Sequence, residues 1–123
     1  MVPGVRLAAA KGDMMARYII TGSYTAAAMK GMIAKPNDRA AATGALVGAS
    51  GGKMESFYLT TGDTDFLMVV HSDNLSNMLA ALMVAGASGA VSGLKTVQAF
   101  TSDEFTAAQK AAGGIAANYR APN

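Results

Sequence analysis

A single α+β domain with one antiparallel sheet is the architecture that this sequence favours, for three reasons. The chain has 123 residues, which suffice for one hydrophobic core but not for two. Apolar residues make up 51% of it and cysteine is absent, which excludes a disordered chain, a disulfide scaffold, thiolate metal sites and a cysteine nucleophile. Runs of β-branched and aromatic residues alternate with stretches whose apolar residues recur at helical spacing.

The first elements are a strand and a helix in two pieces. Residues 16–24 are β-branched and aromatic, which predicts a strand. Thr25 can cap a helix, and Pro36 must interrupt it because the proline ring clashes with the preceding turn. Asn37 or Asp38 can then cap a second helical segment that runs to about residue 49.

A hairpin and a helix follow. Residues 53–61 and 65–71 predict two strands joined by the turn at 62–64. The second of these strands is apolar on both alternating sets of side chains, so we expect it to be covered on both faces. Ser72, Asp73 or Asn74 can cap the next helix. Its apolar residues match a helical stripe in full: Leu75, Met78, Leu79, Leu82 and Met83.

The remaining segments are a loop at 86–89, a fourth strand at 91–100 and a terminal helix. Thr101 and Glu104 form a capping-box pattern that opens this helix, and Gly113-Gly114 should weaken or end it. The order is βαββαβ plus a C-terminal helix. With right-handed crossovers it predicts a ferredoxin-like sandwich that has both crossover helices on one face of the antiparallel sheet.

The uncovered sheet face predicts a partner. One set of apolar side chains from the third strand would lie on it, a larger apolar patch than a soluble monomer tolerates. Two such faces packed together would bury the patch, so we expect a homodimer or a higher homo-oligomer.

Other partners and locations are restricted by charge and hydropathy. The net charge of +2 comes from ten basic and eight acidic residues, and the basic residues are spread singly along the chain, which does not favour nucleic-acid binding. The apolar stretch at 78–91 is too short and interrupted to span a membrane. We expect a cytoplasmic protein with an N-terminal extension at 1–14, translation naturally starting near Met14-Met15, a domain at 15–112 and a C-terminal tail at 113–123.

Several segments together resemble the GYD domain family, which is similar to the dimeric α/β barrel superfamily. The similarity covers about residues 15–110, and Thr64 stands where the family's naming motif has a tyrosine, while Gly62 and Asp65 are retained. The resemblance implies the dimeric barrel fold and no particular chemistry, and any role of that tyrosine is not implied here. The segments that carry it are Tyr24-Thr25, Gly51-Gly52-Lys53, residues 56–66, Gly89-Ala90-Val91 and Ala99-Phe100-Thr101.

Two residues of the predicted third strand could carry chemistry. His71 is the only histidine, and it is either a metal or haem ligand, a general base, or a strand-end residue bonded locally. A metal site would need Asp65 or Glu55 as co-ligands, at no tight motif spacing, so we expect none. Asp65 either accepts N–H groups of the Gly62 turn or acts as an acid or base. Six residues of extended strand would hold His71 and Asp65 about 20 Å apart, so they cannot form one dyad.

The hydroxyls of Tyr24, Tyr58 and Thr96 could line a pocket between sheet and helices, or bond locally. The glycines form neither a P-loop nor a dinucleotide-binding motif. Methionines at helical spacing indicate core filling: Met29, Met32, Met78 and Met83.

No cofactor is indicated, and no catalytic constellation can be assembled from these residues. The sequence therefore favours a small homodimer of uncharacterised role that binds a small apolar or aromatic ligand. The alternative is a cofactor-free monooxygenase or a haem-binding or haem-degrading enzyme, which the wider superfamily suggests by analogy.

Overall fold

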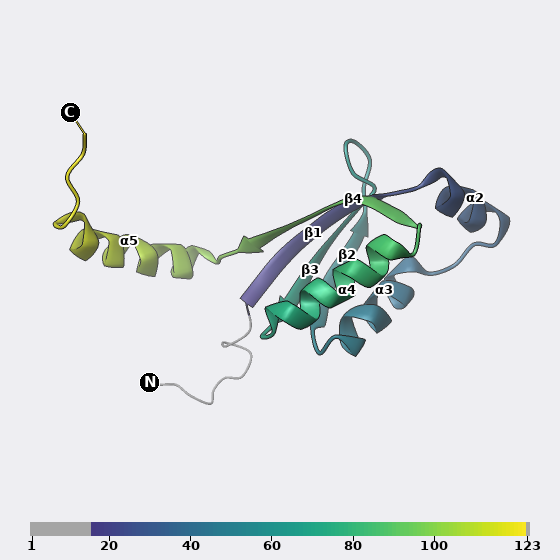
Figure 1. Cartoon of the computed structure of the whole chain (residues 1–123), viewed down its shortest axis with the longest axis horizontal. Helices are drawn as coiled ribbons and strands as arrows, with labels where there is room; N and C mark the ends of the chain where they lie inside the picture. Colours follow the sequence, from purple (N-terminus) through teal and green to yellow (C-terminus); the bar gives the residue numbers. More distant parts are fainter. Residues whose placement is uncertain (1–15, 123) are drawn as a thin grey trace.

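A computed structural model describes residues 16–122, so the predicted N-terminal extension and the start at Met14-Met15 lie outside the described residues. It shows a four-stranded antiparallel sheet in the order β2-β3-β1-β4 with helices α3 and α4 on one face (Figure 1). The strands are β1 (Ala16–Tyr24), β2 (Lys53–Leu59), β3 (Phe66–Ser72) and β4 (Val91–Ala99). The helices are α2 (Ala26–Ala34), α3 (Arg39–Ala49), α4 (Leu75–Ala87) and α5 (Ser102–Ala116). This arrangement confirms the predicted ferredoxin-like fold.

The helices begin where their capping residues predict. The Thr25 side chain accepts the N–H of Ala28, and Asp38 and Asn74 cap α3 and α4 in the same way. The break at Pro36 separates α2 from α3, as predicted. Thr101 and Glu104 form the predicted capping box, but α5 continues through Gly113-Gly114.

Alternation along the two central strands separates the sheet faces. Phe66, Met68 and Val70 of β3 are buried beneath the helices. Leu67 and Val69 point to the other side, which α3 and α4 leave uncovered. The expectation that this strand is covered on both faces therefore holds for the helix side only, because residues 16–122 of the single chain place no second layer on the other face. The remaining buried apolar residues of the core are Ile20, Val47 and Met78.

The helical stripe of α4 is buried over a narrower arc than the sequence predicted. Met78 is buried and Leu82 packs against the core, but Leu79 is 58% exposed and Met83 67% exposed. α4 packs on the sheet, and in the described part of the chain no second helix covers the edge of its stripe that carries Leu79 and Met83. The apolar residues at this edge are therefore exposed to solvent. The expectation that the methionines fill the core is therefore correct for Met78 and wrong for Met83 and for Met29, which is 40% exposed.

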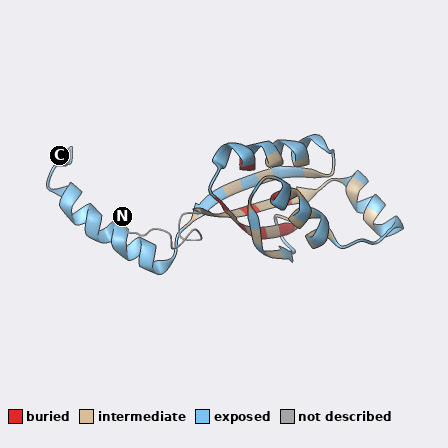
Figure 2. Ribbon diagram, turned by 90° about the horizontal axis from the view of Figure 1, so that it is seen from below, coloured by how far each residue is buried: buried red, intermediate tan, exposed pale blue. Residues whose placement is uncertain are grey.

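Helices α2 and α5 contribute little to the core. α2 lies beyond the end of the sheet and buries no residue. α5 leaves the end of β4 and extends away from the sheet and its helices, exposed along its whole length (Figure 2). The body that forms a core is therefore the sheet with α3 and α4.

Candidate functional site

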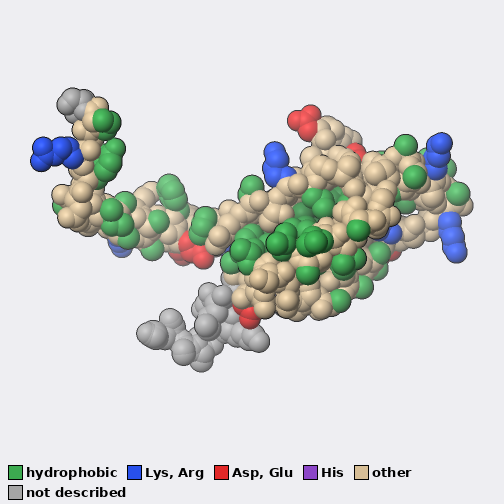
Figure 3. Space-filling view, in the orientation of Figure 1, with side chains coloured by type: hydrophobic (Ala, Val, Ile, Leu, Met, Phe, Trp, Pro, Cys, Tyr) green, Lys and Arg blue, Asp and Glu red, His purple; other side chains and the backbone are tan. Residues whose placement is uncertain are grey.

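An apolar cavity of about 220 Å³ lies between the sheet and the helices α3 and α4. Apolar side chains gather on the face of the molecule that carries these two helices (Figure 3). The sheet contributes the side chains that alternation directs toward the helices, and α3 and α4 contribute small and branched residues. The lining from the sheet comprises Ile20, Tyr24, Phe57, Phe66, Met68, Val70, Val91 and Leu94. The helices supply Ala42, Thr43, Leu46, Val47, Met78, Ala81, Leu82, Val84 and Ala85, among others.

Two hydroxyls of the cavity wall, those of Ser50 and Ser88, already have partners. The Ser50 hydroxyl donates to the Val47 carbonyl at 2.6 Å, and the Ser88 hydroxyl donates to the Ala85 carbonyl at 2.6 Å. A hydroxyl whose only O–H already donates to a backbone carbonyl can offer a ligand only its acceptor oxygen. The interior therefore offers mainly apolar surface and few hydrogen-bond donors.

Tyr24 and Phe66 shape one end of the cavity. Their ring centroids are 5.2 Å apart in a tilted arrangement, and Phe57 stacks on Phe66 at 6.1 Å. Gly22 allows this packing, because a Cβ there would lie 2.6 Å from Cζ of Phe66. The aromatic cluster thus depends on a strand position without a side chain.

Asp65 lies next to this aromatic end, but not in the way that the sequence suggested. Its carboxylate accepts the backbone N–H of Tyr24 at 2.8 Å, and not an N–H of the Gly62 turn. Its own N–H donates to the Gly22 carbonyl at 2.8 Å. Asp65 precedes β3 rather than beginning it, so strand alternation does not place its side chain. It holds the β2–β3 loop against the end of β1, and it lines a shallower hollow beside the main cavity.

His71 is on the opposite face of the sheet and at the opposite end of β3. The register pairs it with Arg17 and Lys53, and its ring nitrogen contacts the Glu55 carboxylate. The hydrogen bond from His71 is the main cause that holds the pKa of Glu55 below its ordinary value. Because His71 and the cavity lie on different faces, a ligand or base role of this histidine would act on the uncovered face.

The other two candidate residues do not join the cavity wall. Tyr58 faces the uncovered side and is 62% exposed. Thr96 is paired with Ile20 but does not line the cavity. Of the five candidates, the structure brings Tyr24 and Asp65 together and leaves His71, Tyr58 and Thr96 apart. Within residues 16–122, no three histidine or acidic side chains gather as a metal site.

Sequence reasoning missed Arg39, the one charged side chain in the described cavity wall. Arg39 is the first residue of α3, directly after the cap Asp38. Its position could have been noticed, because the break at Pro36 fixes where α3 begins. The sequence does not show, however, which part of the sheet this end of α3 lies against.

The fold and the site define a class: a small ferredoxin-like α+β protein with an apolar cavity under its helices. Residues 18–108 match the family model described as the GYD domain, and the chain belongs to that family. No match was found among curated proteins. The predicted division into extension, domain and tail stays a prediction.

Two solved structures resemble this chain at low sequence identity. A transcriptional regulator of Neisseria meningitidis in complex with L-Met is 11% identical, with a TM-score of 0.48 over 83% of this chain and 60% of that one. MtbAldR is 12% identical, with a TM-score of 0.50 over 81% and 61%. The chain thus spans about three fifths of the length of each. The likeness to MtbAldR concerns the fold alone.

In residues 16–122, no helix has both the length and the hydropathy to cross a membrane.

Proposed function

We propose that this protein is a homodimer that binds a small apolar or aromatic molecule in the cavity under α3 and α4. The observation that carries the proposal is the cavity itself, about 220 Å³ with an almost wholly apolar wall. Protein interiors are otherwise packed as tightly as organic crystals. An engineered apolar cavity of about 150 Å³ binds benzene, so this one has room for a molecule with one or two small rings.

The stability of the fold also favours an occupied cavity. The wall includes four of the most deeply buried side chains of the core, Ile20, Phe66, Val70 and Met78. Empty space beside such residues removes dispersion contacts, and in core-truncation series each Å³ of cavity lowers the free energy of unfolding by about 24 cal/mol. A ligand that fills the space restores these contacts and stabilises the folded chain.

The uncovered sheet face supports the homodimer. Its centre is formed by Ile19, Leu67, Val69 and Val97, with Tyr58 beside them. Val97 on this face is 49% exposed in the isolated chain. In an isologous contact between two such faces, the same apolar residues of both copies would be buried, and no other surface would be required.

Helix α5 gives further support for a second copy. Its apolar residues recur at alternating spacings of three and four: Phe105, Ala108, Ala112 and Ile115, with Tyr119 beyond its end. Phe105 is 62% exposed and Ile115 67% exposed. A 15-residue helix with two interior glycines is marginal in water on its own, so α5 needs a surface for this stripe.

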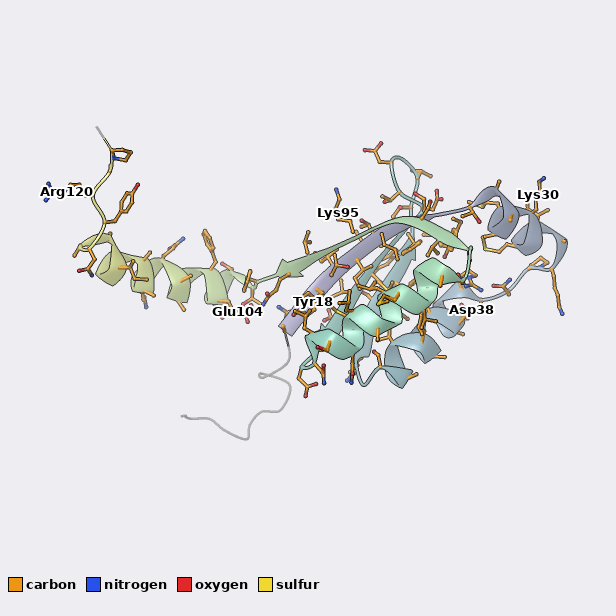
Figure 4. All side chains as sticks on the ribbon, viewed as in Figure 1. Tyr18, Lys30, Asp38, Lys95, Glu104 and Arg120 are labelled. Atoms are coloured by element: carbon orange, nitrogen blue, oxygen red, sulfur yellow. The ribbon has the colours of Figure 1, made fainter. Side chains whose placement is uncertain are left out.

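The start of α5 is anchored at the edge of the uncovered face. A guanidinium nitrogen of Arg17 lies 3.6 Å from the Glu104 carboxylate, and Arg17 itself belongs to that face. Glu104 lies where α5 leaves the end of the sheet (Figure 4). A second copy docked on the sheet would therefore meet α5 directly.

Cavity binding is tested by filling the cavity. Ala85 lines it from α4, whereas Ala87 is exposed at the end of the same helix and outside the wall. Titration calorimetry with indole as the probe should give saturable binding to the wild type and to Ala87→Leu, and at least about tenfold weaker binding to Ala85→Leu. Equal binding to all three proteins, or none to the wild type, would overturn the proposal.

A further inference from the structure

Arg39 lies where the cavity meets two neighbouring hollows. The main cavity and both hollows share only two lining residues, Arg39 and Tyr24. Arg39 is half-buried there, although an arginine at the start of a surface helix can extend fully into water. Arg39 thus stands at the mouth of a cavity whose interior is apolar.

The protein itself uses little of the binding capacity of this guanidinium. One of its nitrogens, Nη1, donates to Oδ1 of Asn37 at 3.1 Å. Within residues 16–122, no carboxylate lies within 4.0 Å of it. A guanidinium has five N–H donors in a planar fork, so most of them are left for water or a ligand.

Two acidic residues beside Arg39, one its sequence neighbour and one in the same hollow, bind backbone N–H groups instead. The Asp38 carboxylate accepts the N–H groups of Ala40 and Ala41 at 3.0 and 3.2 Å. Asp65, which shares a hollow with Arg39, accepts the N–H of Tyr24. Both carboxylates therefore accept backbone N–H groups, and Arg39 has no ion pair within residues 16–122.

We infer that the ligand of this cavity is a small monocarboxylate, with an aromatic or branched aliphatic body in the cavity and its carboxylate on Arg39. The guanidinium fork matches a carboxylate in bidentate geometry, and such charge-assisted hydrogen bonds are about twice as strong as neutral ones. The apolar wall excludes a second charge further in. The single cation at the mouth matches one negative charge rather than two.

This inference rests on the proposed ligand-binding function and is tested with a matched pair of probes. 3-Phenylpropanoate and 3-phenylpropanamide have the same ring and chain and differ in the charge of the head group. Their dissociation constants are measured by calorimetry, at one ionic strength, for the wild type, Arg39→Gln and Lys35→Gln. Lys35 is the exposed C-cap of α2, so its variant removes one charge without touching the cavity.

The carboxylate should bind the wild type about tenfold to a hundredfold more tightly than the amide, as expected for hydrogen bonds to a charged group. Arg39→Gln should remove this preference by weakening carboxylate binding far more than amide binding, and Lys35→Gln should keep it. Arg39→Lys should retain part of it, because the charge remains while the fork is lost.

Two different failures can be told apart. If both probes bind the wild type equally, or Lys35→Gln loses as much preference as Arg39→Gln, the carboxylate assignment is wrong and the cavity proposal stands. If neither probe binds, the proposed function itself is contradicted, and this inference with it.

Discussion

The carboxylate of Asp65 accepts the backbone N–H of Tyr24 at 2.8 Å, across 41 positions of sequence. This bond joins the loop between β2 and β3 to the end of β1, where Tyr24 turns its ring toward Phe66. Next to it, Thr25 caps α2, and its hydroxyl donates to the Gly89 carbonyl at 2.8 Å. One end of the cavity is thus held by polar contacts from three loops.

Asp65→Ala should lower the free energy of unfolding by about 1–3 kcal/mol, because it leaves the Tyr24 N–H without its charged acceptor. Asp65→Asn keeps an oxygen in place and should lose less. Asp63→Ala, at an exposed site in the same loop, should stay within about 0.5 kcal/mol of the wild type in urea unfolding. A loss for Asp63→Ala that matches the loss for Asp65→Ala would contradict the role given to this bond.

Gly22→Ala should disturb the aromatic end of the cavity. Its new Cβ would lie 2.6 Å from Cζ of Phe66 and 3.0 Å from Cδ2 of Leu94, so both side chains must move. We expect destabilisation of about 1–3 kcal/mol by overpacking. Gly31→Ala is the matched control: no other atom lies within 4 Å of a Cβ there, and alanine in α2 should stabilise by about 0.5–1 kcal/mol. Thermal unfolding should show a lower melting temperature for Gly22→Ala and a higher one for Gly31→Ala than for the wild type.

Neighbouring residues of β3 should separate assembly from folding. Val69→Asp places a charge on the uncovered face, and we expect it to convert the proposed dimer into a folded monomer. Met68→Asp buries a charge in the core and should cost more than about 3 kcal/mol, enough to threaten folding. Size-exclusion chromatography with light scattering reads the mass of each. A wild type that elutes as a monomer at micromolar concentration would remove the basis of the dimer.

The capping box of α5 should make its first turn sensitive to acid. The N–H of Thr101 is the main cause that holds the pKa of Glu104 below its ordinary value of 4.5. Since the folded state lowers this pKa, the stabilisation is present above the unfolded value and is lost as the pH falls through the folded one. Amide exchange in α5, followed from about pH 6 downward, should show less protection in acid.

Glu104→Gln tests this assignment, because the amide oxygen can still accept the Thr101 N–H. Glu104→Gln should make the protection of the α5 amides nearly independent of pH in the acid range. Asp103→Asn, which changes the neighbouring acidic residue, should leave the acid dependence of that protection in place. The same acid response in all three proteins would show that Glu104 is not its source.

The sequence was sufficient for features that depend on local chemistry. Thr25, Asn74 and Thr101 cap their helices because short polar side chains satisfy the first N–H groups, whatever the tertiary context. Pro36 breaks the helix for an equally local reason. The order of elements then leaves few topologies for a four-stranded sheet, so the ferredoxin-like fold could be predicted.

Features that depend on distant contacts could not be predicted. Helical spacing marked Leu79 and Met83 as core, but which of them is buried depends on the angle at which α4 crosses the sheet. Asp65 was assigned to a strand because apolar residues follow it, and its bond to Tyr24 joins segments far apart in the chain. Arg39 reaches the cavity mouth only because α3 folds back onto the sheet.

The most direct test of the cavity as a ligand site is a titration with indole followed by NMR of ¹³C-labelled methionine methyl groups. Met68 and Met78 line the cavity, whereas Met83 is exposed on the outer side of α4. Ring-current shifts that saturate and are confined to Met68 and Met78 are the expected result. Unchanged Met68 and Met78 signals, or equal shifts at Met83, would contradict the account.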